Sequence, residues 1–168
     1  MSNDKRPDYS HLFAIAGGAA LGYLFSQGQT EDDKKSRAER DNPDETEEVC
    51  EEIAGLLEAW DPDESCVNEA DYTHDLVAFL NKHSDWEIEV FPNSPEGKPD
   101  ILVGDLLALE LKVGLGKAQR DRLIGQCAGY SRLWVTWAVI LDASESELGR
   151  LVDLLEDKHL NHIAVWGF

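Results

Sequence analysis

The chain has 168 residues, and its 34 acidic side chains against 15 basic ones give a formal net charge of −19 at pH 7. This charge excludes an ordinary nucleic-acid binder that neutralises phosphates over its whole surface. Three cysteines form no CxxC pair, and this odd count argues against a disulfide framework or structural zinc. Neither a P-loop, nor a dinucleotide-binding glycine motif, nor a nucleophile elbow occurs in the sequence.

Residues 1–30 are expected to form a hydrophobic helix, because no charged residue lies between positions 9 and 30. Residues 9–26 approach the length of about 20 apolar residues that a membrane span requires. Three interpretations stay open for this segment: a membrane anchor, a buried or partner-binding helix, and a signal sequence. Four basic residues follow it closely, which favours a cytoplasmic location for the rest of the chain.

An acidic region separates this segment from the main domain. Residues 31–65 contain 15 acidic and 4 basic side chains, and the polar stretch 31–48 is interpreted as a flexible linker. Residues 49–65 are expected to form an amphipathic helix and a connector, with Ile53, Leu56, Leu57 and Trp60 on one helical face. This helix would dock on the following domain or bind a partner.

The remaining residues, 66–168, alternate between helical and strand-like patterns. The periodicity predicts helices over 69–83, 117–131 and 144–157, and strands over 86–90, 101–103, 107–113, 134–141 and 163–166. The 134–141 run is almost wholly apolar, as expected for a strand buried on both faces. We therefore expect an α/β (α+β) fold in which a mixed β-sheet is flanked by helices.

The stretch PDILVGDLLALELK, residues 99–112, carries the most informative pattern. Asp100 precedes one apolar run, while Glu110 and Lys112 stand two positions apart in the next. Side chains at i and i+2 of a strand point to the same face, and a hairpin would bring Asp100 beside them. Two carboxylates and an amine between hydrophobic flanks form a candidate site for Mg²⁺, or Mn²⁺, and phosphodiester hydrolysis. The alternative is a surface-facing strand edge with a cross-strand ion pair.

The neighbouring motifs resemble the PD-(D/E)xK nuclease superfamily. Pro99 and Asp100 match its PD element, and Glu110 to Lys112 match its ExK element. Gln126 and Tyr130 match the QxxxY element of the RecB-like branch. The resemblance covers residues 66–168 and implies the restriction-endonuclease-like fold.

The resemblance also implies roles for these residues. Asp100 and Glu110 would bind the metal, and Lys112 would assist the attacking water. Gln126 would position the substrate or the lysine, and Tyr130 would support the same region. The alternatives are a satisfied polar helix residue for Gln126 and a core aromatic residue for Tyr130.

An acidic residue on the preceding helix often completes such sites in this superfamily. Glu69 is the candidate for this third metal ligand, with Asp71 and Asp75 as neighbouring alternatives. Each of these residues could instead supply a negative charge that favours the N-terminus of the helix.

Basic residues cluster in sequence around the proposed site. The candidates for nucleic-acid binding are Lys98, Lys117, Arg120 and Arg122. Their alternative role is a solvated helix face. The acid-rich, lysine-poor composition resembles that of haloarchaeal proteins, and at molar salt a Debye length of about 3 Å would screen repulsion between the protein and DNA.

These observations predict a Mg²⁺-dependent nuclease that hydrolyses phosphodiester bonds, with DNA as the expected substrate. Its reaction would be attack by water without a covalent intermediate. A homodimer would be required for paired cuts in duplex DNA. The alternative is a catalytically inactive nuclease-fold protein that serves as a membrane-linked nucleic-acid-binding or assembly module.

Overall fold

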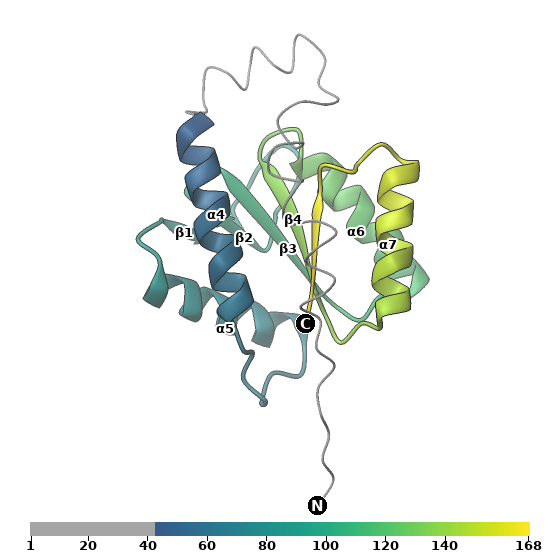
Figure 1. The fold of residues 1–168 in the computed structure, drawn as a ribbon, viewed down its shortest axis with the longest axis horizontal. Coiled ribbons are helices and arrows are strands. Elements are labelled where there is room, and N and C mark those ends of the chain that lie inside the picture. Colours follow the sequence, from purple (N-terminus) through teal and green to yellow (C-terminus); the bar gives the residue numbers. More distant parts are fainter. Residues whose placement is uncertain (1–42) are drawn as a thin grey trace, which may run out of the picture.

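The structure, a computed structural model, describes residues 43–168, and it contains four helices and five strands in this range (Figure 1). The expected hydrophobic helix at residues 1–30 and most of the acidic linker lie outside the described residues. The elements follow in the order α4 (Pro43–Ala59), α5 (Glu69–His83), β1 (Ile88–Val90), β2 (Ile101–Val103), β3 (Leu107–Val113), α6 (Lys117–Tyr130), β4 (Val135–Leu141), α7 (Glu145–Asp157) and β5 (Ala164–Gly167).

The five strands form one mixed sheet in the order β1-β2-β3-β4-β5. The first three strands pair antiparallel, whereas β3, β4 and β5 run parallel. Helices α6 and α7 make the two crossovers that parallel neighbours need. The expected mixed sheet flanked by helices is therefore confirmed.

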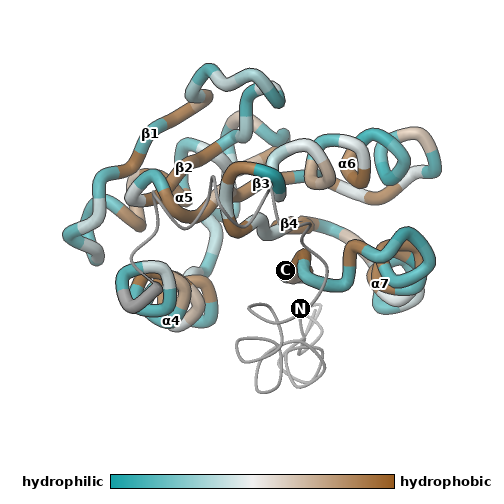
Figure 2. The backbone as a smooth tube through the Cα atoms, turned by 90° about the horizontal axis from the view of Figure 1, so that it is seen from above, coloured by the Kyte–Doolittle hydropathy of each residue, from teal (hydrophilic) through white to brown (hydrophobic). Residues whose placement is uncertain are grey.

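Two hydrophobic cores lie on opposite faces of this sheet. The first joins α4 and α5 to alternate residues of β2, β3 and β4, among them Ile101, Leu109 and Val139. The second joins α6 and α7 to the strand residues that point to the opposite face, among them Ala138 and Ile140 of β4. Figure 1 shows α4 and α5 on one side of the strands and α6 and α7 on the other. The central strands are hydrophobic in Figure 2, whereas hydrophilic and hydrophobic residues alternate along the helices.

Local sequence explains where two of the helices begin. The side chain of Asn68 accepts hydrogen bonds from the backbone N–H groups of Ala70 and Asp71 and so caps α5. Ser144 and Glu147 form a capping box at the start of α7. These caps satisfy donors that have no partner within the helix.

The boundary between linker and amphipathic helix was predicted too late in the chain. Helix α4 begins at Pro43 rather than at position 49, so residues 43–48 are helical. Thr46 is buried and extends the apolar stripe of Val49 and Ile53 by one turn, which explains the earlier start. No helix among residues 43–168 has the length and apolar character needed to cross a membrane.

Candidate active site

The β2–β3 hairpin places Asp100 opposite Glu110. Its turn contains Gly104 and Asp105, which both have positive φ, at 60° and 56°. This turn fixes the register at Ile101 opposite Leu109, so the next pair outward is Asp100 and Glu110. Glycine and aspartate tolerate this conformation, and the loop sequence thereby sets the position of the two carboxylates.

Asp100 is held in place by the neighbouring strand. Its Oδ2 atom accepts a hydrogen bond from the backbone N–H of Leu111 at 2.8 Å, and the side chain is largely buried. The role of this backbone donor was not predicted from the sequence, because an amide N–H carries no residue-type signal. The hydrogen bond fixes the direction of the carboxylate toward β3.

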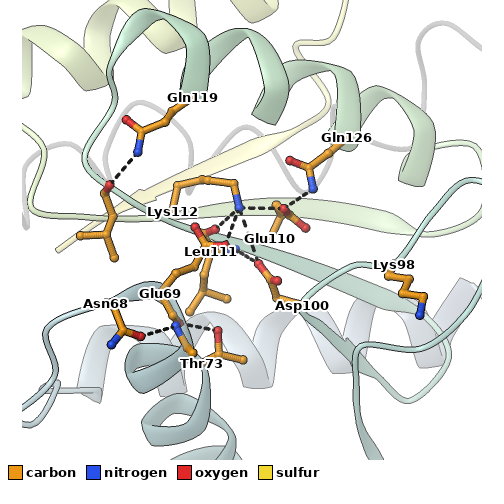
Figure 3. A network of polar contacts seen from close by, with 12 residues as sticks. Asn68, Glu69, Thr73, Lys98, Asp100, Glu110, Leu111, Lys112, Gln119 and Gln126 are labelled. Atoms are coloured by element: carbon orange, nitrogen blue, oxygen red, sulfur yellow. Dashed lines mark hydrogen bonds and ion pairs between the residues drawn. The ribbon is translucent and has the colours of Figure 1, made fainter.

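The Lys112 ammonium lies at the centre of the site (Figure 3). Its Nζ atom is 2.9 Å from Glu110 Oε1, 3.0 Å from Glu69 Oε1 and 3.9 Å from Asp100 Oδ2. It also donates a hydrogen bond to the carbonyl of Leu111 at 2.6 Å. Lys112 is 5% exposed and Glu110 is 1% exposed, so this is a buried ion-pair network rather than a solvated strand edge.

Of the three acidic residues considered on α5, only Glu69 has a contact with the lysine among those described. Asp71 accepts a hydrogen bond from Asn68 Nδ2 at 2.7 Å, beside the N-terminus of the helix. Asp75 accepts a hydrogen bond from the Trp60 indole at 2.8 Å, on the side facing α4. The geometry therefore distinguishes Glu69 from the two alternatives.

Helix α6 contributes two polar side chains from consecutive turns. Gln126 Nε2 donates to Glu110 Oε1 at 2.6 Å, so this glutamine contacts the carboxylate rather than the lysine. The Tyr130 hydroxyl donates to the carbonyl of Lys98 at 2.8 Å and accepts a longer hydrogen bond from Gln126 at 3.4 Å. Tyr130 thereby ties the segment before Asp100 to α6.

Burial and mutual repulsion perturb both carboxylates. Burial and then the negative charge of Asp100 raise the pKa of Glu110 to about 7. Burial also raises the pKa of Asp100, although the Leu111 N–H and Lys112 oppose the effect. For Lys112, burial lowers the pKa, but Glu110 and Asp100 outweigh it and leave the pKa above its ordinary value. Such coupled shifts are typical of functional sites.

Two buried oxygens of the site have no hydrogen-bond partner. They are Glu110 Oε2 and Gln126 Oε1. A buried polar atom without a partner costs free energy and calls for an explanation, such as a bound ion or a ligand group. These oxygens are therefore free to accept an interaction from a group that enters the site.

The four basic candidates are not equivalent. Arg122 lies close enough to Asp100 to lower the pKa of that carboxyl, against the larger effect of burial. Arg120 turns back toward the carbonyl of Leu115, with an Nη1–O distance of 3.4 Å. Lys117 is exposed at the start of α6, and the ammonium of Lys98 points away from the carboxylates in Figure 3. Only Arg122, among these four residues, has a described electrostatic effect on an acidic residue of the site.

Neither family models, nor curated proteins, nor solved structures provide a match to this chain. Within residues 43–168, no group of three or more histidine, cysteine or acidic side chains is arranged to hold a metal ion. The position between Glu69 and Glu110 is taken by the Lys112 ammonium.

Proposed function

We propose that this protein is a metal-dependent nuclease of the PD-(D/E)xK superfamily, with the restriction-endonuclease-like fold and DNA as substrate. The observation that carries the proposal is the buried Lys112 ammonium beside Glu110 and Asp100, at distances of 2.9 and 3.9 Å. Lysine and carboxylates are rarely buried together unless they serve one another or a bound group. A purely structural sheet would place an apolar residue at such a position at a lower cost.

The order of elements supports this fold assignment. A helix, an antiparallel three-stranded unit and the α6 crossover to β4 follow in the order that the superfamily resemblance implies. The PD residues directly precede β2, the ExK residues lie in β3, and the QxxxY residues lie in α6. Glu69 and Lys112, which are 43 positions apart in sequence, thereby meet in one site.

The donor set suits a hard divalent cation. Mg²⁺ prefers oxygen ligands, and Asp100 and Glu110 would hold it. Glu69 would join them as a third carboxylate by turning from its ion pair with Lys112. The unpartnered Oε2 of Glu110 is an available ligand atom. When bound, Mg²⁺ or Mn²⁺ would supply a Lewis acid and lower the pKa of a bound water.

The residues of the chain have separable tasks in this proposal. Lys112 would orient the attacking water and stabilise the negative charge that builds up on the phosphate. Gln126 fixes the carboxylate of Glu110 through its 2.6 Å hydrogen bond. Arg122, at the rim of the same site, would bind a neighbouring phosphate.

The alternative function is a catalytically inactive nuclease-fold protein that binds nucleic acid or takes part in an assembly, with a membrane link through residues 9–26. The strongly acidic chain favours the assembly role within this alternative, because a charge of −19 repels DNA at low salt. Melting temperatures distinguish the two functions. A nuclease site predicts that Mg²⁺ or Mn²⁺ raises the melting temperature and that Asp100→Ala abolishes the rise.

The proposed function is tested by incubating the full chain with single-stranded, duplex and branched DNA in molar KCl. Reactions contain Mg²⁺, Mn²⁺ or EDTA, and Lys112→Ala is compared with Lys82→Ala, a change in the last turn of α5. We expect metal-dependent cleavage of at least one DNA by the wild type and by Lys82→Ala, but not by Lys112→Ala. Binding of DNA without cleavage under every metal condition would favour the alternative.

A further inference from the structure

We propose that Phe91 forms a stacking platform for an unpaired nucleobase and that the substrate class of this site is single-stranded nucleic acid. This inference rests on the proposed nuclease function and specifies its substrate. It is carried by the position of Phe91 at the end of β1, its exposure, its backbone conformation and the anchoring of the loop that follows it.

Phe91 stands in register with the two central carboxylates. The β1–β2 pairing places Val90 opposite Ile101, and the next pair outward is Phe91 and Asp100. The backbone N–H of Phe91 donates to the carbonyl of Asp100 at 3.0 Å. Because Asp100 in turn stands opposite Glu110, the backbones of the three residues lie in one row, in which Phe91 directly follows β1 and Asp100 directly precedes β2. Phe91 is therefore the immediate cross-strand neighbour of a proposed metal ligand.

The aromatic ring is exposed where a folding role would bury it. Phe91 is 44% exposed, and among residues 43–168 the only other exposed large hydrophobic residues are Val67 and Val90. Its φ is 50°, a conformation that bulky residues rarely adopt. Partial burial alone does not call for a phenylalanine at this position, and the backbone conformation disfavours one. Outlying backbone conformations cluster at ligand-binding and active sites.

The loop that follows Phe91 is fastened to α6 at its far end. Tyr130 donates from its hydroxyl to the carbonyl of Lys98, and its ring lies against Gly97. Arg132 forms an ion pair with Glu96 at 3.3 Å. The hydrogen bond from Phe91 to Asp100 fixes one end of this segment, and the contacts with Tyr130 and Arg132 fix the other. The segment therefore has a defined position relative to Asp100 and Glu110. The backbone that carries the phenyl ring is thus held beside Asp100 by a supported loop.

One exposed ring with a single apolar neighbour, Val90, suits a nucleobase better than a protein surface. Stable protein interfaces need contiguous apolar cores, whereas stacking needs only one aromatic face. Bases in a duplex already stack on each other, so Phe91 reaches a base only in an unpaired strand. The negative charge of the chain leads to the same expectation, because stacking does not depend on attraction to phosphate and persists when salt screens that attraction.

The test is fluorescence anisotropy with the full chain, in molar KCl and EDTA so that no cleavage occurs. The probes are a fluorescein-labelled oligothymidylate and a duplex of equal length. Phe91→Asn removes the ring and introduces a residue that tolerates positive φ, whereas Phe91→Trp retains an aromatic face. Val67→Asn removes the most exposed hydrophobic side chain, which is 77% exposed and precedes α5, and serves as the matched control.

We expect wild type, Phe91→Trp and Val67→Asn to bind the oligothymidylate more tightly than the duplex. Phe91→Asn should bind it about 5- to 150-fold more weakly, the range for loss of one stacked base, with the duplex affinity unchanged. Equal binding by Phe91→Asn and Val67→Asn would overturn the stacking platform but leave the nuclease proposal to its cleavage assay. Failure of the wild type to bind either probe, together with no cleavage of any DNA, would overturn both.

Discussion

Lys112 and Glu110 point to the same face of β3 and are joined by a 2.9 Å ion pair that is nearly closed to solvent. A second ion pair, at 3.0 Å, links the same ammonium to Glu69 of α5. In this structure the lysine is therefore the counter-ion of the acidic site. A divalent cation held by the same carboxylates would share them with Lys112, and this relationship makes the energetics of the site testable.

Replacing Lys112 should destabilise the metal-free protein while strengthening its response to metal. Lys112→Met leaves buried carboxylates without their counter-ion, which costs about 3–5 kcal/mol in comparable networks. Added Mn²⁺ should raise the unfolding free energy of this variant by more than it raises that of the wild type, because in the variant the cation does not compete with the ammonium. Urea unfolding with and without Mn²⁺ measures both effects, and Lys82→Met is the control. Equal stabilisation of both proteins by Mn²⁺ would contradict the shared site.

Glu69→Gln should affect activity far more than stability. The Glu69 side chain is 44% exposed, so its ion pair with Lys112 contributes less than about 1 kcal/mol to the unfolding free energy. Loss of its charge should nevertheless lower the cleavage rate by about 10- to 100-fold, the range found when groups that support a metal site are removed. Glu58→Gln on α4, across the sheet, should retain the wild-type rate. Equal rates in the two variants would remove Glu69 from the site.

Gln126→Ala should impair the position of Glu110 without removing a charge. The variant loses the 2.6 Å hydrogen bond from Nε2 to Glu110 Oε1, so the carboxylate gains freedom to rotate. We expect a fall of about 10- to 100-fold in the apparent affinity for Mn²⁺, measured by calorimetry. Asn81→Ala, which removes an exposed amide on α5, is the control. Unchanged Mn²⁺ affinity in Gln126→Ala would show that Glu110 needs no such support.

The stability of the metal-free protein should fall as pH rises from 4.5 to about 7. Burial and the charge of Asp100 raise the pKa of Glu110 from 4.5 to about 7. Between pH 4.5 and about 7, the folded state therefore retains a proton on Glu110 that the unfolded chain has already released. This stabilisation is fully present below pH 4.5 and is lost as pH rises through about 7; it is on the order of 3 kcal/mol.

Urea unfolding across this pH range, in EDTA, measures the effect. The Glu110→Gln variant cannot exchange this proton, so its unfolding free energy should depend less steeply on pH than that of the wild type. The raised pKa of Asp100 acts in the same direction and remains in the variant. Identical pH profiles for the two proteins would show that Glu110 titrates normally in the folded state.

Local sequence patterns were sufficient for the elements that carry the site. Strand β3 and helix α5 have the predicted bounds, because an apolar run with an internal ExK pattern and a capped helical stripe leave few alternatives. The convergence of Asp100 and Glu110 also followed from the sequence, since a short turn between two apolar runs predicts a hairpin. The beginning of α4 was missed because its first turn is acidic and resembles the preceding linker.

The features that depend on tertiary contacts were not predictable in the same way. The sequence could not distinguish Glu69 from Asp71 and Asp75, because the choice depends on how α5 approaches the end of β3. Arg120 and Arg122 are two positions apart and chemically alike, yet only Arg122 acts on Asp100. Phe91 lies just outside the predicted strand over 86–90, and its register opposite Asp100 becomes visible only once the strands are paired.

The central claim is that Asp100, Glu110 and Lys112 form one metal-dependent hydrolytic centre. It is tested most directly by the initial rate of DNA cleavage as a function of Mn²⁺ concentration for wild type, Glu110→Gln and Glu58→Gln. The account predicts a rate that saturates with Mn²⁺ in wild type and Glu58→Gln, and a fall of about 100-fold or more in Glu110→Gln. Cleavage by Glu110→Gln at the wild-type rate, or cleavage that persists in EDTA, would contradict it.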